Sequence, residues 1–205
     1  MIGRPALRVS LLRCLFGDRS GVTLVEFAIV GPVLILMIMG LFDISHSQYT
    51  SSVLQGALQK AGRDLTLQNG ASNQTAIDNF MIGQVKAVMP NNAQVTVEKE
   101  SFFDFSDVGR AEQIVNDANN NGVCNTGETY IDANNSGSWN ASRGRSGLGG
   151  ARDVVLYTAT VTYPRLFPMA GLAGLPSDVT LKSSTVLRNQ PFNTQAGRNT
   201  TVRNC

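Results

Sequence analysis

The feature that most constrains this chain is a mostly apolar run from Val22 to Phe42, in which Glu26 is the only ionisable side chain. About twenty helical residues cross a hydrocarbon core of roughly 30 Å, so the run is long enough to span a membrane. Arginines precede the run and Asp43 follows it, a charge pattern that predicts a cytoplasmic N-terminus. We therefore expect a single-pass membrane protein with residues 43–205 outside the cytoplasm.

Glu26 is costly at this position, because a charge near the middle of a spanning helix costs about 2.5–3.5 kcal/mol, and less near an end. A cut after Gly21 would give Val22 a free ammonium one helical turn from Glu26, and the two charges could neutralise each other within one chain or between neighbours. The first turn of a helix also favours a negative charge. Two alternatives stay open. One is a shallow Glu26 that reaches interfacial water in an uncleaved anchor; the other is an ordinary signal sequence, although no clear small-x-small cleavage site follows the run.

The N-terminal part of the chain combines an arginine-rich leader, Gly21, four mostly apolar residues, Glu26-Phe27 and a long apolar helix. This pattern resembles the processing site of Flp-type prepilins and pseudopilins. More specifically, the stretch GVTLVEFAIVGPVLILMIMGLFDISHSQYTSSVLQGALQKAGRDL is similar to the TadE-like minor pseudopilins of tight-adherence (Tad/Flp) pilus systems. The resemblance is strongest over residues 19–66.

The resemblance implies a maturation step and a set of partners. A prepilin peptidase would cut after Gly21 on the cytoplasmic side, so that Val22 becomes the mature N-terminus and Glu26 its fifth residue. Glu26 would serve processing and helix packing, and Phe27 completes the motif. The implied partners are the peptidase, other pseudopilins, the Flp pilin, the inner-membrane secretion machinery and membrane lipid. The implied location is a bacterial inner membrane, with the C-terminal domain periplasmic or extracellular and associated with the pilus.

Periodicity beyond the membrane run predicts an α+β fold. The first helix is expected to end between residues 65 and 70, and a second helix over 74–88 would bury Ile77, Phe80, Met81, Val85 and Val88. Three runs alternate polar and apolar residues as strands do: 93–105, 153–164 and 178–189. We expect a small antiparallel sheet beside the helices, a pilin-like head on a long N-terminal helix. The predicted divisions are a leader (1–21), a transmembrane part (22–42), an extracytoplasmic helical region (43–90), a β-rich head (91–190) with an insertion (117–143), and a polar tail (191–205).

A second motif is DANNNGVCNTGE, residues 117–128, which fits the calcium-loop template D-x-[DN]-x-[DN]-G-x5-E without a mismatch. With two carboxylates we expect weak calcium binding, about 0.1–1 mM as in extracellular modules, and a structural role. An Asn/Gly-rich surface loop without an ion is the alternative. A degenerate copy begins at Asp132, but Arg143 stands where its closing acid would be. The predicted ligands are Asp117, Asn119, Asn121, the Val123 carbonyl, Asn125 through water, and Glu128.

The cysteines divide between the leader and the head. Cys14 lies in the leader, whereas Cys124 and Cys205 lie on the side of the membrane where a disulfide can persist. A bridge between them would close a loop of about 80 residues and contribute at most about 4–5 kcal/mol on the chain-entropy model. Free or intermolecular thiols are the alternative.

Charge and composition argue against nucleic-acid binding and catalysis. The formal net charge of the whole chain is +2, and residues 1–21 alone carry +3, from four arginines and Asp18. The remaining residues therefore carry −1, which gives no basic surface for binding nucleic acid. His46 is the only histidine, which excludes a multi-histidine metal site, and we expect it on a solvated helix face. No Ser-His-Asp signature or phosphate-binding loop occurs in the sequence. We predict a protein that is not an enzyme.

The leading hypothesis is a TadE-like minor pseudopilin, a membrane-anchored assembly subunit matured by cleavage after Gly21. The runner-up is a single-pass anchored adhesin or sensor domain with a calcium loop outside the cytoplasm, which retention of residues 1–21 would favour. A secreted domain whose apolar run is removed is the third possibility.

Overall fold

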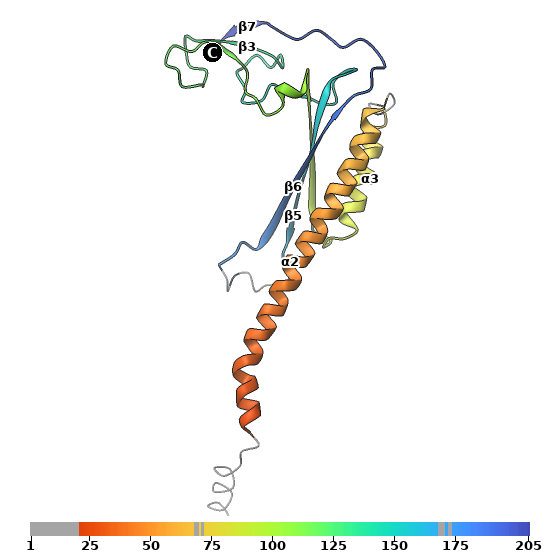
Figure 1. Ribbon diagram of the computed structural model, residues 1–205, viewed down its shortest axis with the longest axis vertical. Helices are drawn as coiled ribbons and strands as arrows, with labels where there is room; N and C mark the ends of the chain where they lie inside the picture. The colour runs from red at the N-terminus through yellow and green to blue at the C-terminus, as the bar shows by residue number, and fades with distance from the viewer. Residues whose placement is uncertain (1–20, 68–69, 71, 168–170, 172–173) are drawn as a thin grey trace, which may run out of the picture.

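The longest element is a helix, α2 (Val22–Thr66), which runs from one end of the molecule into the head (Figure 1). The computed structural model describes residues 21–67, 70, 72–167, 171 and 174–205, so residues 1–20 of the predicted leader lie outside them. The 45 residues of α2 continue through Pro32 and end at Thr66, inside the predicted interval. At 1.5 Å per residue the helix is about 68 Å long, twice the thickness of a hydrocarbon core.

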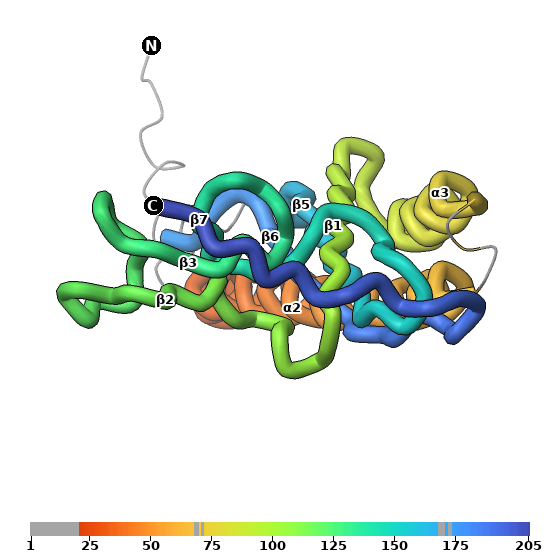
Figure 2. Tube along the Cα trace, turned by 90° about the horizontal axis from the view of Figure 1, so that it is seen from above, coloured from red at the N-terminus to blue at the C-terminus, as the bar shows by residue number. Residues whose placement is uncertain are grey.

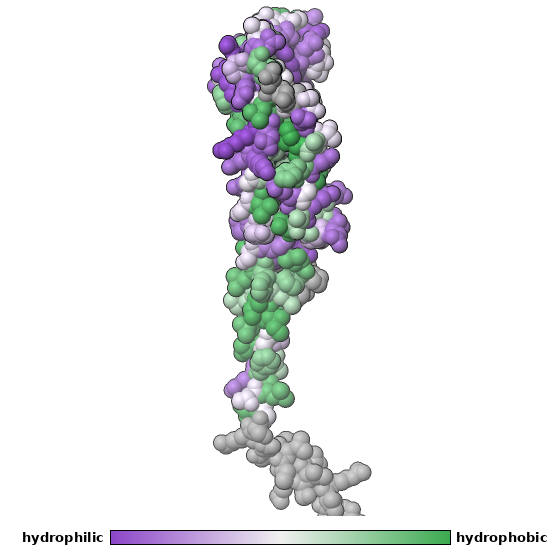
Figure 3. Space-filling model, turned by 90° about the vertical axis from the view of Figure 1, so that its right-hand side faces the viewer, coloured by the Kyte–Doolittle hydropathy of each residue, from purple (hydrophilic) through white to green (hydrophobic). Residues whose placement is uncertain are grey.

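The two halves of α2 have different surroundings. Between Val22 and Phe42 nearly all large apolar side chains are exposed, with Leu24 at 73% and Ile29 at 70%. Figure 3 shows this half as a hydrophobic stretch below a head of mixed polarity. Among the described residues, α2 is the one helix long and apolar enough to cross a membrane, and its most apolar window has a mean hydropathy of 2.4. Its N-terminal half therefore fits a single-pass anchor.

The C-terminal half of α2 packs on a second helix, α3 (Gln74–Lys86), which ends two residues before its predicted limit. Met81 and Val85 of α3 are fully buried. Phe80 is 52% exposed, so its predicted place in the core is wrong. The buried residues of α3 recur every four positions, which leaves Phe80 at the flank, where Lys60 Nζ lies 4.3 Å from its ring centroid.

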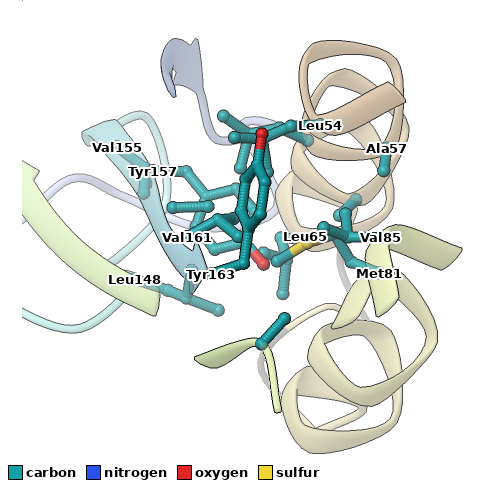
Figure 4. Close-up of a cluster of buried hydrophobic side chains, with 14 residues drawn as sticks. Leu54, Ala57, Leu65, Met81, Val85, Leu148, Val155, Tyr157, Val161 and Tyr163 are labelled. Atoms are coloured by element: carbon teal, nitrogen blue, oxygen red, sulfur yellow. The ribbon is translucent and has the colours of Figure 1, made fainter. Parts of the chain in front are cut away.

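An antiparallel sheet covers the helices in the strand order β4-β1-β5-β6. Its strands are β1 (Gln94–Phe102), β4 (Arg145–Ser146), β5 (Val154–Pro164) and β6 (Asp178–Arg188). The three long strands coincide with the three predicted runs, and the α+β fold is confirmed. Alternate residues of β5 point towards α2 and α3 and form the core with Leu54, Leu65, Met81 and Val85 (Figure 4). The inward residues of β5 are Val155, Tyr157, Ala159, Val161 and Tyr163.

A second, smaller sheet lies at the end of the molecule farthest from the start of α2 (Figure 1). Its order is β2-β3-β7, from β2 (Ile114–Asn116), β3 (Thr129–Ile131) and β7 (Val202–Asn204). Figure 2 shows the C-terminal segment crossing the head to reach β3. A 3-10 turn, η1 (Phe105–Asp107), follows β1. Strands of three residues are too short to show alternation, so the sequence did not predict this sheet.

Candidate functional site

The start of α2 brings the predicted processing residues together. The Gly21 carbonyl accepts a hydrogen bond from Val25 N–H at 3.1 Å, which places Gly21 at the helix entrance. Val22 and Glu26 lie one turn apart on one helix face, and both are exposed. Among the described residues, a Cβ added at Gly21 would meet nothing within 4 Å. Packing against this part of the chain therefore does not require glycine at position 21.

Phe27, the other motif residue, lies over Gly31. A Cβ on Gly31 would be 3.2 Å from Cε1 and Cζ of the Phe27 ring, closer than most side-chain contacts. Gly31 is accordingly buried, while the Phe27 side chain remains 66% exposed. One face of the ring thus rests on α2, and the rest is open to lipid or to a neighbouring helix.

Polar side chains attach the head to α2 just beyond the membrane segment. Asp43, 8% exposed, forms an ion pair with Arg165, which follows β5. His46 Nε2 lies 3.1 Å from Val88 O, and the imidazole packs edge-on against Tyr163 with centroids 5.6 Å apart. The prediction of a solvated His46 is wrong, because the head covers this turn of the helix and half-buries the ring.

The predicted calcium loop, residues 117–128, folds back on its first aspartate. Asp117 lies at its first position, where Oδ1 accepts from Asn121 N–H at 3.2 Å and Oδ2 from Gly122 N–H at 2.9 Å. Asn119 Oδ1 accepts from the same Asn121 N–H at 3.0 Å. Gly122 has φ of 73°, in the left-handed region that glycine adopts without strain. The first half of the loop is therefore wrapped around the Asp117 carboxylate.

Glu128 closes this loop. Its side chain is almost fully buried, and its carboxylate accepts from Ala118 N–H at 3.1 Å and from Asn125 N–H at 2.8 Å. Among the described residues, none forms an ion pair with Glu128. A buried carboxylate held only by neutral donors is an electrostatic cost that a cation would offset.

Three predicted ligand oxygens of the loop face a single point. Asn125 Nδ2 lies 2.7 Å from Val123 O, 3.2 Å from Asn121 Oδ1 and 3.4 Å from Glu128 Oε2. A donor surrounded by three acceptors marks a position that suits a cation, and rotation of the Asn125 amide would add a further oxygen. No group of three or more His, Cys, Asp or Glu side chains gathers in the part of the chain that the structure describes. A cation here would depend on neutral oxygens, which calcium accepts.

The degenerate copy, which begins at Asp132, repeats the hydrogen bonds that the first half of the loop makes to its leading aspartate. Asp132 is fully buried, and its Oδ1 and Oδ2 each lie 3.0 Å from the N–H groups of Ser136 and Gly137. Gly137 has φ of 80°. Arg143, at the position of the missing acid, instead donates to Asp107 at 3.1 Å. The loop's own twelfth residue therefore does not close it.

Glu112 is the site residue that the sequence did not reveal, because it lies outside both twelve-residue templates. Its side chain is 2% exposed, and its carboxylate accepts from Ala133 N–H at 2.8 Å and Asn140 N–H at 2.9 Å, both in the second loop. A spacing signal was present, since Glu112 precedes Asp117 by about the interval that separates Glu128 from Asp132.

A disulfide and ion pairs help to hold the C-terminal tail to this region. Cys124 and Cys205 form a disulfide with Cα atoms 5.6 Å apart. Arg198 pairs with Asp107 at 2.8 Å, and Asp107 also pairs with Arg143. Burial by itself would raise the pKa of Asp107, but the hydrogen bonds and charges of Arg198 and Arg143 outweigh it and hold that pKa below its usual value. The tail is thus anchored by a covalent bond and by an ionised carboxylate.

Comparison with known families gives a match at the other end of the molecule. Residues 21–63 match the family model described as TadE-like protein. This segment is TadE-like. It covers α2 from the glycine before the helix almost to its last turn, and includes all four predicted processing residues. The match of this segment indicates that the protein is associated with a Tad pilus. No curated protein and no solved structure matches the chain.

Proposed function

We propose that this protein is a TadE-like minor pseudopilin, a non-enzymatic, membrane-anchored subunit for assembly of a Tad/Flp-type pilus. The observation that carries the proposal is the coincidence of the TadE-like segment, residues 21–63, with a helix whose first half exposes its apolar side chains. In this proposal a prepilin peptidase cuts after Gly21, residues 22–42 anchor the mature chain in the inner membrane, and the head lies outside the cytoplasm. Other pseudopilins, the Flp pilin and the secretion machinery are the proposed partners.

Glu26 has a defined role in this proposal. Cleavage turns Val22 N into an ammonium, and in a helix the side chain four residues later lies beside it. Pairing of Glu26 with this ammonium, or with that of a neighbouring subunit, removes the cost of an isolated charge in lipid. Helices packed side by side are then held in the register that leaves no charge unpaired, while exposed apolar side chains such as Phe27 fill the contact.

The decisive experiment is the intact mass and N-terminal sequence of the full chain, expressed with and without a Flp-type prepilin peptidase. We expect a chain that begins at Val22 only when the peptidase is present. The variant Gly21→Leu should lose cleavage almost completely while the head folds normally, because a Cβ at position 21 meets nothing within 4 Å in the described part of the chain. Gly40→Leu is the matched control, since that position is equally open and lies far from the cut.

The remaining outcomes of this experiment also discriminate. A wild-type chain that keeps residues 1–21 in both expressions contradicts the pseudopilin proposal and favours an anchored adhesin or sensor. A chain that loses the whole apolar run would indicate a secreted domain. The variant Glu26→Gln separates a role of the carboxylate in cleavage from a role in assembly. If the variant is cleaved normally but is not recovered together with other pseudopilins, the carboxylate serves assembly.

We further propose that residues 117–128 bind calcium and that the ion orders the insertion at the far end of the head. The convergence of Asn121, Val123 and Glu128 oxygens on one point supports this, as does the uncompensated charge of Glu128. Asp117, Asn119 and Asn125 supply the remaining oxygens of the template. Calcium fits better than magnesium because the loop offers many flexible oxygens and not a rigid octahedron.

Calcium titration of the full chain in detergent tests this loop. At about 10 mM calcium, a site of 0.1–1 mM affinity should raise the free energy of unfolding by about 1.5–3 kcal/mol. Glu128→Gln should remove one bound ion and its share of this gain. Glu98→Gln, an exposed glutamate on β1 outside both loops, is the charge-matched control and should change neither. An unchanged ion count in Glu128→Gln would contradict a site in this loop.

A further inference from the structure

Two glutamates in the head make the same pair of hydrogen bonds to two different loops. Glu128 accepts from the second and ninth residues of the loop that begins at Asp117. Glu112 accepts from the second and ninth residues of the loop that begins at Asp132, through Oε1 and Oε2 respectively. In each loop, the first aspartate accepts from the N–H groups of the fifth and sixth residues. The two loops are therefore built alike, except that one closing acid comes from outside.

The short strands explain how an acid outside the loop reaches it. Glu112 precedes β2 and Glu128 precedes β3, while one loop follows each strand. Because β2 and β3 are antiparallel, the start of each strand lies beside the end of the other. Ile131 N–H donates to Gln113 O at 2.8 Å, which brings Glu112 next to Asp132. Each glutamate thus closes the loop that follows the partner strand, a nearly twofold arrangement.

We propose that residues 132–140 form a second calcium site, closed by Glu112 from outside the loop. Three neutral oxygens of this loop already lie together: Ser136 Oγ is 2.8 Å from Ser138 O and 2.5 Å from Asn140 Oδ1. With a carboxylate oxygen each from Asp132 and Glu112, and Asn134 Oδ1, the loop offers the six oxygens that calcium needs as a minimum. This site stands whether or not the first loop binds an ion.

The charges at this position call for a cation. Glu112 and Asp132 are both nearly inaccessible to water, and Arg203 Nε pairs with Asp132 Oδ2 at 2.5 Å. Among the described residues, that guanidinium is the one cation paired with either carboxylate, so one buried negative charge is left over. Arg203 and Gly137 N–H both contact Oδ2, so Oδ1, which accepts from Ser136 N–H, is the carboxylate oxygen left for an ion.

A buried hydroxyl gives independent support. Tyr130 of β3 is fully buried, and its hydroxyl has no hydrogen-bond partner in the described part of the chain. Tyr130 lies opposite Ile114, which is two residues from Glu112, and Asp132 follows Tyr130 by two residues, so the three side chains leave the small sheet on the same face. A polar atom buried without a partner costs about 1–3 kcal/mol, which an ion or its bound water would offset here.

The only tryptophan of the chain provides a local probe. Trp139 lies in the second loop, and its Nε1 donates to Glu112 O at 3.0 Å. Terbium, which takes calcium sites, luminesces when an excited indole close by transfers energy to it. We therefore titrate the full-length protein in detergent with terbium under selective tryptophan excitation, and count bound calcium by calorimetry. We expect two calcium ions per chain and a terbium signal that calcium displaces.

Glutamine variants assign each ion. Glu112→Gln should lose the tryptophan-sensitised signal, with terbium affinity reduced at least about tenfold, and should keep one calcium ion. Glu128→Gln should keep the signal and also keep one ion, so failure of the first-loop proposal is distinguishable from failure of this one. Glu98→Gln should match the wild type. A signal that survives in Glu112→Gln, or that disappears in Glu128→Gln alone, overturns the second site.

Loss of the fold in Glu112→Gln would still leave a test. Ser136 and Asn121 occupy the fifth position of the two loops, and both are exposed, so alanine at either costs little packing. Ser136→Ala should weaken the tryptophan-sensitised terbium signal several-fold, while Asn121→Ala leaves it unchanged. Equal signals in these two variants would overturn the proposal. Circular dichroism and the intact disulfide report whether each variant is folded.

Discussion

Replacing Asp78 with alanine is expected to destabilise the head by about 3–5 kcal/mol, because it leaves a buried ammonium without its partner. Asp78 of α3 forms an ion pair with Lys99 of β1, whose side chain is only 6% exposed. The other Asp78 oxygen accepts from the Tyr157 hydroxyl at 2.8 Å. Burial, and then the hydrogen bond and charge of Asp78, raise the pKa of Tyr157, so the phenol stays a donor. This carboxylate thus joins α3 to two strands of the sheet.

Denaturant unfolding of the full chain in detergent, followed by circular dichroism, measures this effect. The control Asp178→Ala removes an exposed acid at the start of β6 and should change stability by less than about 0.5 kcal/mol. A paired replacement, Asp78→Leu with Lys99→Met, should recover most of the loss because both charges leave the interior together. A cost below about 1 kcal/mol for Asp78→Ala would show that Lys99 reaches water once its partner is gone.

Breaking the Cys124–Cys205 disulfide should have an effect of similar size. The bond joins residues 81 positions apart, so the chain-entropy model gives a loss of at most about 4–5 kcal/mol in Cys124→Ser/Cys205→Ser. Without it the tail is held by the three exposed residues of β7 and by ion pairs such as Arg198–Asp107. We expect trypsin to cut at Arg198 and Arg203 in the variant well before it cuts the wild type.

Cys14, in the predicted leader, offers the matched control for this experiment. Cys14→Ser should leave both stability and proteolysis unchanged. Cys205 N–H also donates to Glu128 O at 3.0 Å, so the bond lies against the first loop. Calcium should therefore slow the cleavage of the tail by trypsin in the protein that lacks the disulfide. Equal trypsin resistance in the wild type and the double serine variant would mean that β7 pairing alone suffices, contrary to this prediction.

Much of the fold was predictable because its signals are local. The mostly apolar run from Val22 to Phe42 can be recognised from its composition alone, so the candidate anchor was predictable. Strands β1, β5 and β6 are 9 to 11 residues long, enough for alternation to be visible. Strands β2, β3 and β7 have three residues each and are stabilised by neighbours far away in sequence, so local periodicity could not reveal them.

By itself the sequence determined the long helix and the three long strands, and it showed the predicted processing motif at Gly21 to Phe27 and the first calcium-loop template. Each of these depends on residues within one continuous segment. Only the tertiary structure decided that the head covers His46, that Phe80 lies outside the core, and that Glu112 closes the second loop. These depend on which surfaces meet when distant segments pack. For Glu112 the physical reason is antiparallel pairing, which sets the start of one short strand beside the end of another.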